Sequence, residues 1–323
     1  MSQPYVNPQA PRAFKKERRT TLFFDNLEKF ASGLNPAPAF KSFTLDDLNP
    51  LSGSRRQRVI YAPNRSMAKV HQLLLTYLRK IRGNKPAHIT ACYPGCSPRL
   101  GLNHHLGHRF FYLVDLTHAY ESVNRWQLVS ALTSLDSELI GSELKIHVFL
   151  QRFCLLPDSK KGGLVIGVPA SPDLFNIYCH FWIDPSLLEL SRKHGLTYTR
   201  YLDDLVFPAN ESIGKHKRQA VREVVESARF SVAHHKCRVA DLSKGPVVIN
   251  GYGLDLTGRV FIPSRFRRRV SGVMHLASRG KVVESKVHGL MGVIQSTGRP
   301  RGLIGGETRR LFRNYRQFSR SMR

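Results

Sequence analysis

The chain is poor in acidic residues, in cysteine and in long apolar runs. It holds 23 Asp and Glu against 50 Lys and Arg among 323 residues, so its formal net charge is +27. No apolar run approaches the roughly 18 residues that a membrane span needs, which argues against an integral membrane protein. The five cysteines include no Cys-x-x-Cys pair, which argues against a disulfide scaffold or a zinc ribbon. Few cysteines fit a reducing, cytoplasmic setting, and the first residues lack the apolar core of a secretory signal.

The chain is rich in basic residues and has the overall composition of a globular protein. Hydrophobic residues make up 41% of it, which excludes a wholly disordered chain. Nucleic acid is the first candidate partner, because basic side chains that bind phosphates release counterions. Residues 262–323 hold 15 Lys and Arg against two acids, Glu284 and Glu307, so nearly half of the net charge lies there. The alternative is a soluble surface with surplus arginine.

The spacing of apolar residues predicts a mixture of helices and strands. A continuous apolar run ending in an acid predicts a buried strand over 109–116. Runs rich in β-forming residues around turns predict hairpins over 50–66, 196–207 and 247–262. Helical spacing and capping residues predict the remaining elements, which are helices over 23–34, 67–81 and 124–135, one within 211–230, and one that begins at Ser171 and ends before Pro185.

Three acids carry the strongest chemical signal. Asp115 ends the predicted buried strand, and Asp203 and Asp204 lie in the tight turn of a predicted hairpin. A carboxylate at the end of a buried strand is costly unless a cation pairs with it. If the two strands are neighbours in one sheet, the carboxylates converge and can hold Mg²⁺ through hard oxygen ligands. The alternative is ordinary turn chemistry, since Asp favours turns.

Three segments around these acids resemble the motifs of reverse transcriptases. Tyr201-Leu202-Asp203-Asp204 looks like the YxDD motif, and Leu113–Tyr120 resembles motif A, an acid followed five residues later by an aromatic. Gly167–Asn176 resembles motif B, the G-x-x-x-S-P-x-L-x-N pattern. The three occur in the order that the family has. The resemblance covers roughly residues 50–275 and implies an α+β, right-hand polymerase fold with fingers, an antiparallel palm and a mostly helical thumb.

The resemblance also implies a division of the chain into consecutive parts. They are a basic flexible arm over 1–20, an N-terminal region with the fingers over 21–108, a palm with a fingers insertion over 109–245, a palm–thumb hairpin over 246–262, and a basic helical thumb over 263–323.

The catalytic roles follow from the motifs position by position. Asp115 and Asp203 would ligate two Mg²⁺ ions, and Asp204 would be a third, more peripheral carboxylate. Such a pair of ions would activate a primer 3′-OH and stabilise the leaving pyrophosphate. Lys236 falls where motif D places a lysine thought to protonate the pyrophosphate, although a surface lysine is the plainer reading.

Four further residues would bind the nucleotide if the resemblance holds. Arg58 would contact the triphosphate, and the ring of Tyr120 would lie where a 2′-OH would go and so favour deoxynucleotides. Gly167 would let the backbone approach the template or the incoming nucleotide, which a β-carbon would block. Ile166 stands where the family usually has glutamine, which puts substrate preference in question. The plainer readings are a solvated hairpin charge for Arg58 and a core aromatic for Tyr120.

Smaller resemblances indicate the retron type. Thr199-Arg200-Tyr201 before the acids is similar to retron enzymes, whose motif commonly reads YxRYxDD. Asn103–His108 and Val248–Gly251 resemble the retron NAxxH and VTG elements in degenerate form. A retron-like bacterial enzyme would copy a structured non-coding RNA into single-stranded DNA, in antiphage defence with a separate effector protein. Enzymes of diversity-generating elements and group II introns are the rival subfamilies.

The basic end of the chain would be the RNA-binding thumb, helical from Ser264 and broken near Gly280. Its densest cluster is Arg265, Arg267, Arg268 and Arg269, with Phe266 between them, a pattern suited to phosphate pairing and base stacking. The implied partners are a structured RNA template and primer, dNTPs and a DNA product, with no membrane; a separate effector protein and a second copy of the chain stay open as further partners.

Two alternatives and one metal hypothesis stay open at this point. The chain could be a catalytically idle RNA-binding scaffold that keeps the palm, or a template-independent or protein-primed polymerase of the same family. His104 and His108 are four residues apart and could ligate a metal on a helix, but no further ligand completes the site. An RNA contact or an interior hydrogen bond is the favoured role for these histidines.

Overall fold

The computed structural model describes residues 21–48, 55–156 and 162–277, together with residue 313. The basic arm predicted over 1–20, the break near Gly280 and most of the predicted thumb lie outside these residues. The chain divides into two compact units, each built from two stretches. Unit 1 comprises Met1–Arg82 and Val123–Ile177, and unit 2 comprises Gly83–Ser122 and Tyr178–Arg323. This interleaving differs from the consecutive division that the sequence suggested, whose fingers and palm borders stay predictions.

Unit 1 is mainly helical. Its elements are α1 (Thr21–Ser32), α2 (Arg65–Ile81), α4 (Arg125–Leu135), the short 3-10 helix η2 (Ser137–Leu139), α5 (Glu143–Phe153) and the first part of α6 (Ser171–Trp182). The helices predicted over 23–34, 67–81 and 124–135 are confirmed. Phe24 of α1 joins α2 and α5 by edge-to-face contacts with Tyr77 at 5.7 Å and Phe149 at 5.2 Å. Asn64 caps α2, because its side chain accepts a hydrogen bond from the amide of Met67.

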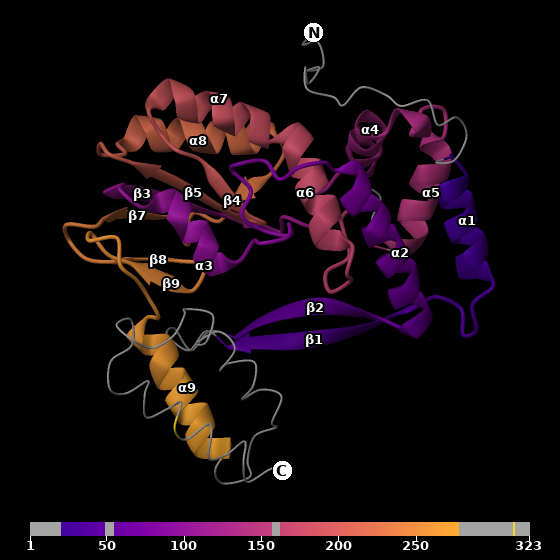
Figure 1. Ribbon diagram of the computed structural model, residues 1–323, viewed down its shortest axis with the longest axis horizontal. Coiled ribbons are helices and arrows are strands. Elements are labelled where there is room, and N and C mark those ends of the chain that lie inside the picture. Colours follow the sequence, from indigo (N-terminus) through magenta and orange to yellow (C-terminus); the bar gives the residue numbers. More distant parts are fainter. Residues whose placement is uncertain (1–20, 49–54, 157–161, 278–312, 314–323) are drawn as a thin grey trace. The chain divides into compact units, whose positions relative to one another are not determined.

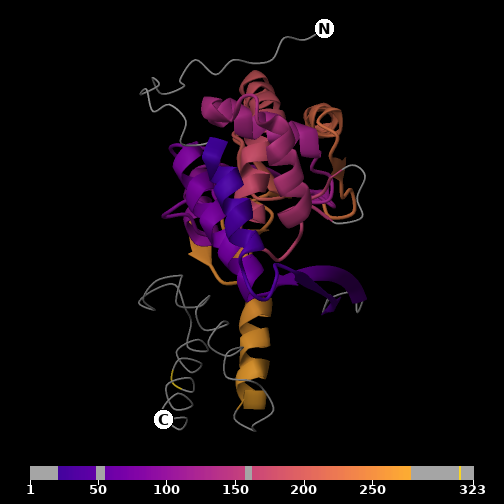
Figure 2. The same cartoon turned by 90° about the vertical axis from the view of Figure 1, so that its right-hand side faces the viewer.

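A two-stranded antiparallel hairpin, β1 (Phe40–Leu48) and β2 (Arg55–Pro63), extends from the helices of unit 1 (Figures 1 and 2). Its register runs from Phe40 opposite Pro63 to Leu48 opposite Arg55. The second strand was predicted from the run around Val59, and it is confirmed. The first strand was missed, since the prediction placed the whole hairpin within 50–66. Pro63 ends β2 because it cannot donate to the ladder.

Unit 2 is built on a five-stranded antiparallel sheet. Its strands are β3 (Phe110–Thr117), β4 (Thr199–Tyr201), β5 (Asp204–Ala209), β6 (Ser231–Val232) and β7 (Arg238–Asp241). The buried strand predicted over 109–116 is β3, and the hairpin predicted over 196–207 is β4 with β5. β3 is central: β5 pairs with one edge, while β7 and β6 share the other edge in succession.

The two faces of this sheet pack against different layers (Figure 1). Phe111, Leu113 and Val206 point into one core with a second sheet, β8 (Val247–Ile249), β9 (Tyr252–Leu254) and β10 (Val260–Phe261). On the opposite face, α7 (Asp184–His194) and α8 (Lys215–Ser227) lie over the strands. Because side chains alternate along a strand, each residue of β3 is assigned to one of these layers by its parity. The hairpin predicted over 247–262 is thus a three-stranded sheet.

The remaining elements of unit 2 are α3 (Pro98–Gly101), the 3-10 helix η1 (Leu102–His105) and α9 (Ser264–Ala277). His105 Nε2 lies 2.8 Å from the hydroxyl of Thr199, and His108 Nε2 lies 3.2 Å from the hydroxyl of Thr197. Of the two roles expected for His104 and His108, an RNA contact or an interior hydrogen bond, the structure shows a half-buried hydrogen bond for His108, while His104 is exposed. None of the helices in the described part of the chain is long and apolar enough to cross a membrane.

Candidate functional site

Asp115 and Asp204 face each other across the central strand pair. Asp115 of β3 is the direct cross-strand partner of Asp204 of β5, one step beyond the pairs Val114–Leu205 and Leu113–Val206. By the alternation of side chains, both carboxylates lie on the face that buries Leu113 and Val206, at the point where the apolar core ends. The convergence of the two predicted acidic sites in one sheet is confirmed.

The turn between β4 and β5 places Asp203 beside this pair. Tyr201 and Asp204 are paired, so Leu202 and Asp203 form a two-residue connection. Leu202 has a φ of +56°, a left-handed conformation that L residues with side chains adopt reluctantly. The carbonyl of Asp203 accepts a hydrogen bond from the amide of Leu116 at 3.3 Å, which ties the turn to β3 immediately after Asp115.

The three carboxylates create a strongly negative spot. Burial raises the pKa of Asp204 to about 7, and the charges of Asp203 and Asp115 add to the shift against the opposing charges of Lys236 and Arg238. A carboxyl group whose pKa is raised in this way is mostly neutral below about pH 7, unless a cation joins the cluster and stabilises its charged form. Carboxylate oxygens are the donors that a hard divalent cation such as Mg²⁺ prefers, so the side-chain chemistry of these residues fits the metal that the motifs imply.

Lys236 supplies a cation to the cluster. Its ammonium group lies 2.7 Å from Oδ1 of Asp115, and it is held in the turn after β6 by a hydrogen bond from its amide to the carbonyl of Ala233. The side chains are 35% and 24% exposed, so solvent screens the pair. The structure thus brings the predicted catalytic lysine to a predicted metal ligand. Its role as a proton donor stays a prediction.

Tyr120 belongs to the same neighbourhood. It follows β3 in a turn and is partly exposed. Its pKa is raised, first by burial and next by the negative charge of Asp203. The predicted gate therefore lies close enough to a predicted metal ligand to respond to its charge.

The motif B loop is fastened to the strand β2 within unit 1. The carbonyl of Ile166 accepts a hydrogen bond from the amide of Tyr61 at 2.9 Å. Gly167 has a φ of +105°, and a β-carbon on it would lie 2.7 Å from the carbonyl oxygen of Tyr61 and 2.7 Å from Cγ2 of Ile60. Arg58 lies two residues before Ile60 on the same strand. Unit 1 therefore brings the segments of Arg58, Ile166 and Gly167 together, while their nucleotide contacts stay predictions.

The start of α6 is held by an ion pair that the sequence did not suggest. Asp173, in the first turn of this helix, pairs with Arg82, and the two side chains are 3% and 4% exposed. The hydroxyl of Ser171 donates to the carbonyl of Val165 at 2.6 Å, which closes the loop onto the helix. Asp173 lies directly after the predicted cap and proline, and that position is favourable for an acid near a helix N-terminus. The partner 91 residues away had no local signal.

The arginine cluster lies on α9. Phe266 and Val273 of this helix pack against the core of unit 2, and Arg265 and Arg268 are exposed. Arg267 and Arg269 belong to the same helix. The predicted basic surface therefore begins on α9, and the apolar side of this helix packs against the core of unit 2.

The chain belongs to the reverse transcriptase family. The family model described as "Reverse transcriptase (RNA-dependent DNA polymerase)" matches residues 51–254, more than half of the 323 residues. This match covers all three predicted motifs and confirms the polymerase fold class. Mixed helices and antiparallel sheets accord with it.

Retron enzymes are among the curated relatives, as the smaller resemblances predicted. The chain is 26% identical over 239 residues to the retron Mx65 reverse transcriptase of Myxococcus xanthus, covering 71% of this chain and 55% of the relative. It is 30% identical to the retron Mx162 enzyme of the same organism, covering 52% of this chain and 39% of the relative. It is 24% identical to the retron Ec86 enzyme of Escherichia coli, covering 59% of this chain and 52% of the relative. The chain therefore spans between about two fifths and just over half of the length of these relatives.

Solved structures with a similar chain include telomerase. The apo telomerase from Candida tropicalis, truncated from the C-terminal domain, is 15% identical, with a TM-score of 0.44, and the alignment covers 69% of this chain and 55% of that chain.

Proposed function

We propose that the protein is an RNA-directed DNA polymerase that copies a cognate structured RNA into single-stranded DNA. The observation that supports this most directly is the cross-strand pair of Asp115 and Asp204, with Asp203 in the adjoining turn, in a chain of the reverse transcriptase family. Two Mg²⁺ ions held by Asp115, Asp203 and Asp204 would activate the primer hydroxyl and stabilise the leaving pyrophosphate.

The remaining predicted site residues would act directly on the nucleotide or the RNA, without binding a metal ion. Tyr120 would lie against the sugar of the incoming nucleotide and exclude a 2′-OH. Lys236 Nζ, now paired with Asp115, would give a proton to the departing pyrophosphate. Arg58 would pair with the triphosphate, since guanidinium groups bind phosphate oxygens in a bidentate manner. The exposed arginines Arg265 and Arg268 would bind the RNA backbone.

The first test is primer extension. The purified chain, an RNA template with a DNA primer, dNTPs and Mg²⁺ should give DNA, and replacing both Asp203 and Asp204 by Asn should abolish synthesis while RNA affinity stays the same or rises. Asp241→Asn is the matched control, because this acid, on β7 of the same unit, pairs with Arg109 away from the proposed metal ligands. An inactive wild-type chain that still binds RNA would favour the scaffold, and synthesis that survives removal of RNA would favour a template-independent or protein-primed polymerase.

We further propose that the RNA serves as its own primer and that the product acts in antiphage defence with a separate effector. The names of the relatives support the retron type, and self-priming and a role in defence are what the resemblance to that type implies. The protein would be purified from its native host context, and its bound nucleic acid would be digested separately with RNase and DNase before sequencing. A defined RNA joined covalently to its DNA copy is expected. RNA without DNA, even after addition of dNTPs and Mg²⁺, would contradict the self-primed reading.

A further inference from the structure

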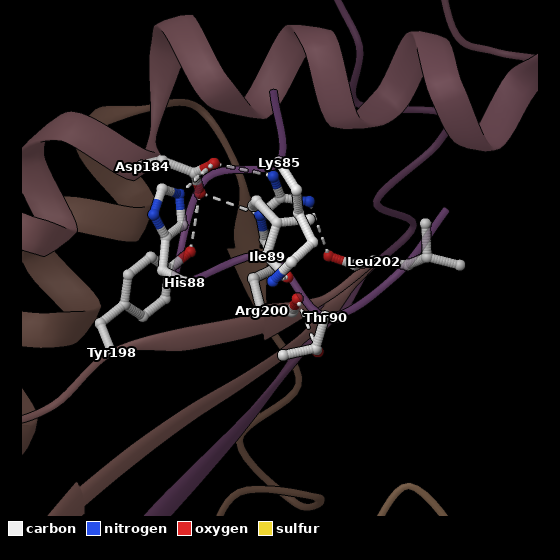
Figure 3. Close-up of polar contacts among 8 residues, drawn as sticks. All are labelled: Lys85, His88, Ile89, Thr90, Asp184, Tyr198, Arg200 and Leu202. Carbon is white, nitrogen blue, oxygen red and sulfur yellow. Dashed lines mark hydrogen bonds and ion pairs between the residues drawn. The ribbon is translucent and has the colours of Figure 1, made fainter. Parts of the chain in front are cut away.

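The carboxylate of Asp184 gathers polar groups from three other residues in the interior of unit 2 (Figure 3). Its Oδ1 accepts hydrogen bonds from Arg200 Nε at 2.9 Å and from the hydroxyl of Tyr198 at 2.8 Å. Its Oδ2 accepts from Arg200 Nη2 at 2.7 Å and lies 3.2 Å from Nε2 of His88. The side chains of Asp184 and Arg200 are both 0% exposed. Both oxygens of one buried carboxylate are therefore engaged by a single planar guanidinium.

The charges of this pair hold each other. Burial alone would raise the pKa of Asp184, but the charge of Arg200 and the nearby imidazole of His88 hold it well below its usual range. Asp184 is also the first residue of α7, where the helix dipole favours a negative charge. A buried ion pair of this kind contributes geometry more dependably than net stability, because desolvation offsets the attraction. We therefore ask which part of the chain this ion pair holds in place.

The pair positions the turn that carries two of the proposed metal ligands. Arg200 Nη1 donates to the carbonyl of Leu202 at 3.4 Å, a contact drawn in Figure 3. Leu202 is the residue with the left-handed φ of +56°, and Asp203 and Asp204 follow it directly. The side chain that Asp184 fixes thus reaches over Tyr201 to the backbone of the turn.

The backbone of Arg200 is fixed as well. Its amide donates to the carbonyl of His88 at 2.9 Å, and its carbonyl accepts from the amide of Thr90 at 3.0 Å and from the hydroxyl of Thr90 at 3.1 Å. These bonds make residues 88–90 a one-bridge parallel neighbour of β4, centred on Ile89 and Arg200. Arg200 is therefore restrained through its main chain and its side chain, two residues before the turn.

The same place could be mistaken for a metal site. His88, His180 and Asp184 each offer a ligand atom within 4.8 Å of the others, and among the described residues they are the group of three that does so. Both oxygens of Asp184 already accept hydrogen bonds from the guanidinium of Arg200, however, and a metal ion there would be repelled by that buried positive charge. The ion pair thus accounts for the arrangement better than a metal does.

We propose that Asp184 and Arg200 are positioning residues for polymerisation: their buried ion pair sets the conformation of the Leu202–Asp203 turn and so the arrangement of the carboxylates that bind Mg²⁺. Both side chains are buried, so neither is placed to contact a substrate directly. The expected effect on the rate of polymerisation rests on the proposed function. The expected effect on cation binding rests only on the geometry of the turn. A loosened turn would weaken the affinity for the divalent cation and slow the chemical step, while the affinity for RNA would not change.

The test compares Arg200→Lys, which keeps the charge but loses the planar fork, with Asp184→Asn, which keeps the shape but loses the charge. Each variant is assayed at a temperature where its unfolding curve shows it folded. For both we expect half-saturation by Mg²⁺ in primer extension to rise several-fold, and kcat at saturating Mg²⁺ to fall about 10- to 100-fold, the size of effect that a misplaced reactive geometry causes. The KM for template–primer should stay within about two-fold.

Arg109→Lys is the matched control. Arg109 makes the same kind of two-pronged pair with Asp241, through Nε at 2.8 Å and Nη2 at 3.0 Å, where β7 pairs with the start of β3, far along the strand from Asp115. This variant should leave Mg²⁺ half-saturation and kcat unchanged. A structural effect without positioning would lower the melting temperature of Arg200→Lys and leave both of those quantities alone, which would overturn the proposal.

Binding of Mn²⁺, followed by electron paramagnetic resonance without any substrate, separates this inference from the proposed function. Wild-type protein should bind Mn²⁺, Asp203→Asn should bind it poorly, and Arg200→Lys should bind it several-fold more weakly than wild type. If Arg200→Lys or, where that variant fails to fold, Asp184→Asn binds Mn²⁺ as tightly as wild type, the proposal is wrong whether or not the chain polymerises. If binding follows the expectation but the wild type makes no DNA, the proposed function fails while the role of the pair in shaping the turn stands.

Discussion

Gly167 and Tyr61 are in such close contact that a β-carbon at position 167 would lie 2.7 Å from the carbonyl oxygen of Tyr61. The sequence suggested that this glycine makes room for nucleic acid or nucleotide. The structure gives it a second reason within unit 1: the motif B loop lies directly on the backbone of β2 and is bonded to it through Ile166. A glycine here is thus required by the protein's own packing, before any ligand is considered.

Gly167→Ala should therefore destabilise unit 1. The φ of +105° is costly for alanine, and the added carbon meets backbone that cannot rotate away, so we expect a loss of about 3 kcal/mol in the free energy of unfolding. Urea unfolding measures it. Gly214→Ser is the control, because Gly214 caps α8 with a negative φ and open space around it, and serine should be neutral or stabilising there. Equal stabilities of wild type and Gly167→Ala would refute the packing argument.

Asp204→Asn should trade activity for stability. The substitution removes a carboxylate whose pKa burial and the neighbouring acids raise to about 7, so near pH 8 and without divalent cations it should stabilise the fold by about 1 to 2 kcal/mol. Thermal unfolding in EDTA checks this. Mg²⁺ should raise the melting temperature of the wild type and have little effect on the variant. A variant less stable than wild type in EDTA would mean that the carboxylates do not repel one another.

His105 should make the fold sensitive to acid. Burial lowers its pKa to about 3, with further lowering by the charges of His104 and His108. An unfolded chain binds a proton at this position below about pH 6.5 while the folded chain does not, so stability is lost as the pH falls, by at most about 1.4 kcal/mol per pH unit. His105→Asn removes the titrating group, and urea unfolding at several pH values between 7.5 and 5 should show a shallower slope. Identical slopes would exclude His105 as the source.

The exposed arginines of α9 should bind phosphates. Replacing Arg265 and Arg268 by Gln is expected to weaken RNA binding at all sequences alike and to reduce the slope of log affinity against log salt by about 1 to 2. Fluorescence anisotropy at several salt concentrations gives this slope. Arg109→Gln is the control, because Asp241 already neutralises that arginine. An unchanged slope in the double variant would place the RNA surface elsewhere.

The parts of the site that were predicted correctly depend on short stretches of sequence. The apolar run before Asp115 predicted a buried strand, and the acids after Tyr201 predicted a hairpin, and the structure pairs the two in one sheet. The expectation that both acids lie in the turn was wrong for Asp204, which is the first residue of β5, because only Leu202 and Asp203 connect the strands. Parity along the strand then fixes the face on which their side chains lie.

The parts that were missed depend on partners far apart in the chain. Asp184 stood in the sequence only as the residue before Pro185, where one helix was expected to end, and no nearby pattern shows that Arg200 will cover it. The strand Phe40–Leu48 was missed because its final stretch carries two adjacent acids, Asp46 and Asp47, and lacks an apolar run. This segment is a strand because it pairs with β2 along its whole length, and its own composition does not indicate that pairing.

The interleaving of the two units has a consequence for synthesis on the ribosome. The helices of unit 1 that emerge first include α2, whose His71 is buried and lies within 2.9 Å of the carbonyl of Phe153. That partner is translated 82 residues later, after the chain has already delivered Gly83–Ser122, the first stretch of unit 2. The nascent protein must therefore carry two unfinished cores at once, so slowing elongation between residues 83 and 153 would lengthen the interval in which apolar surface is open to chaperones or to aggregation.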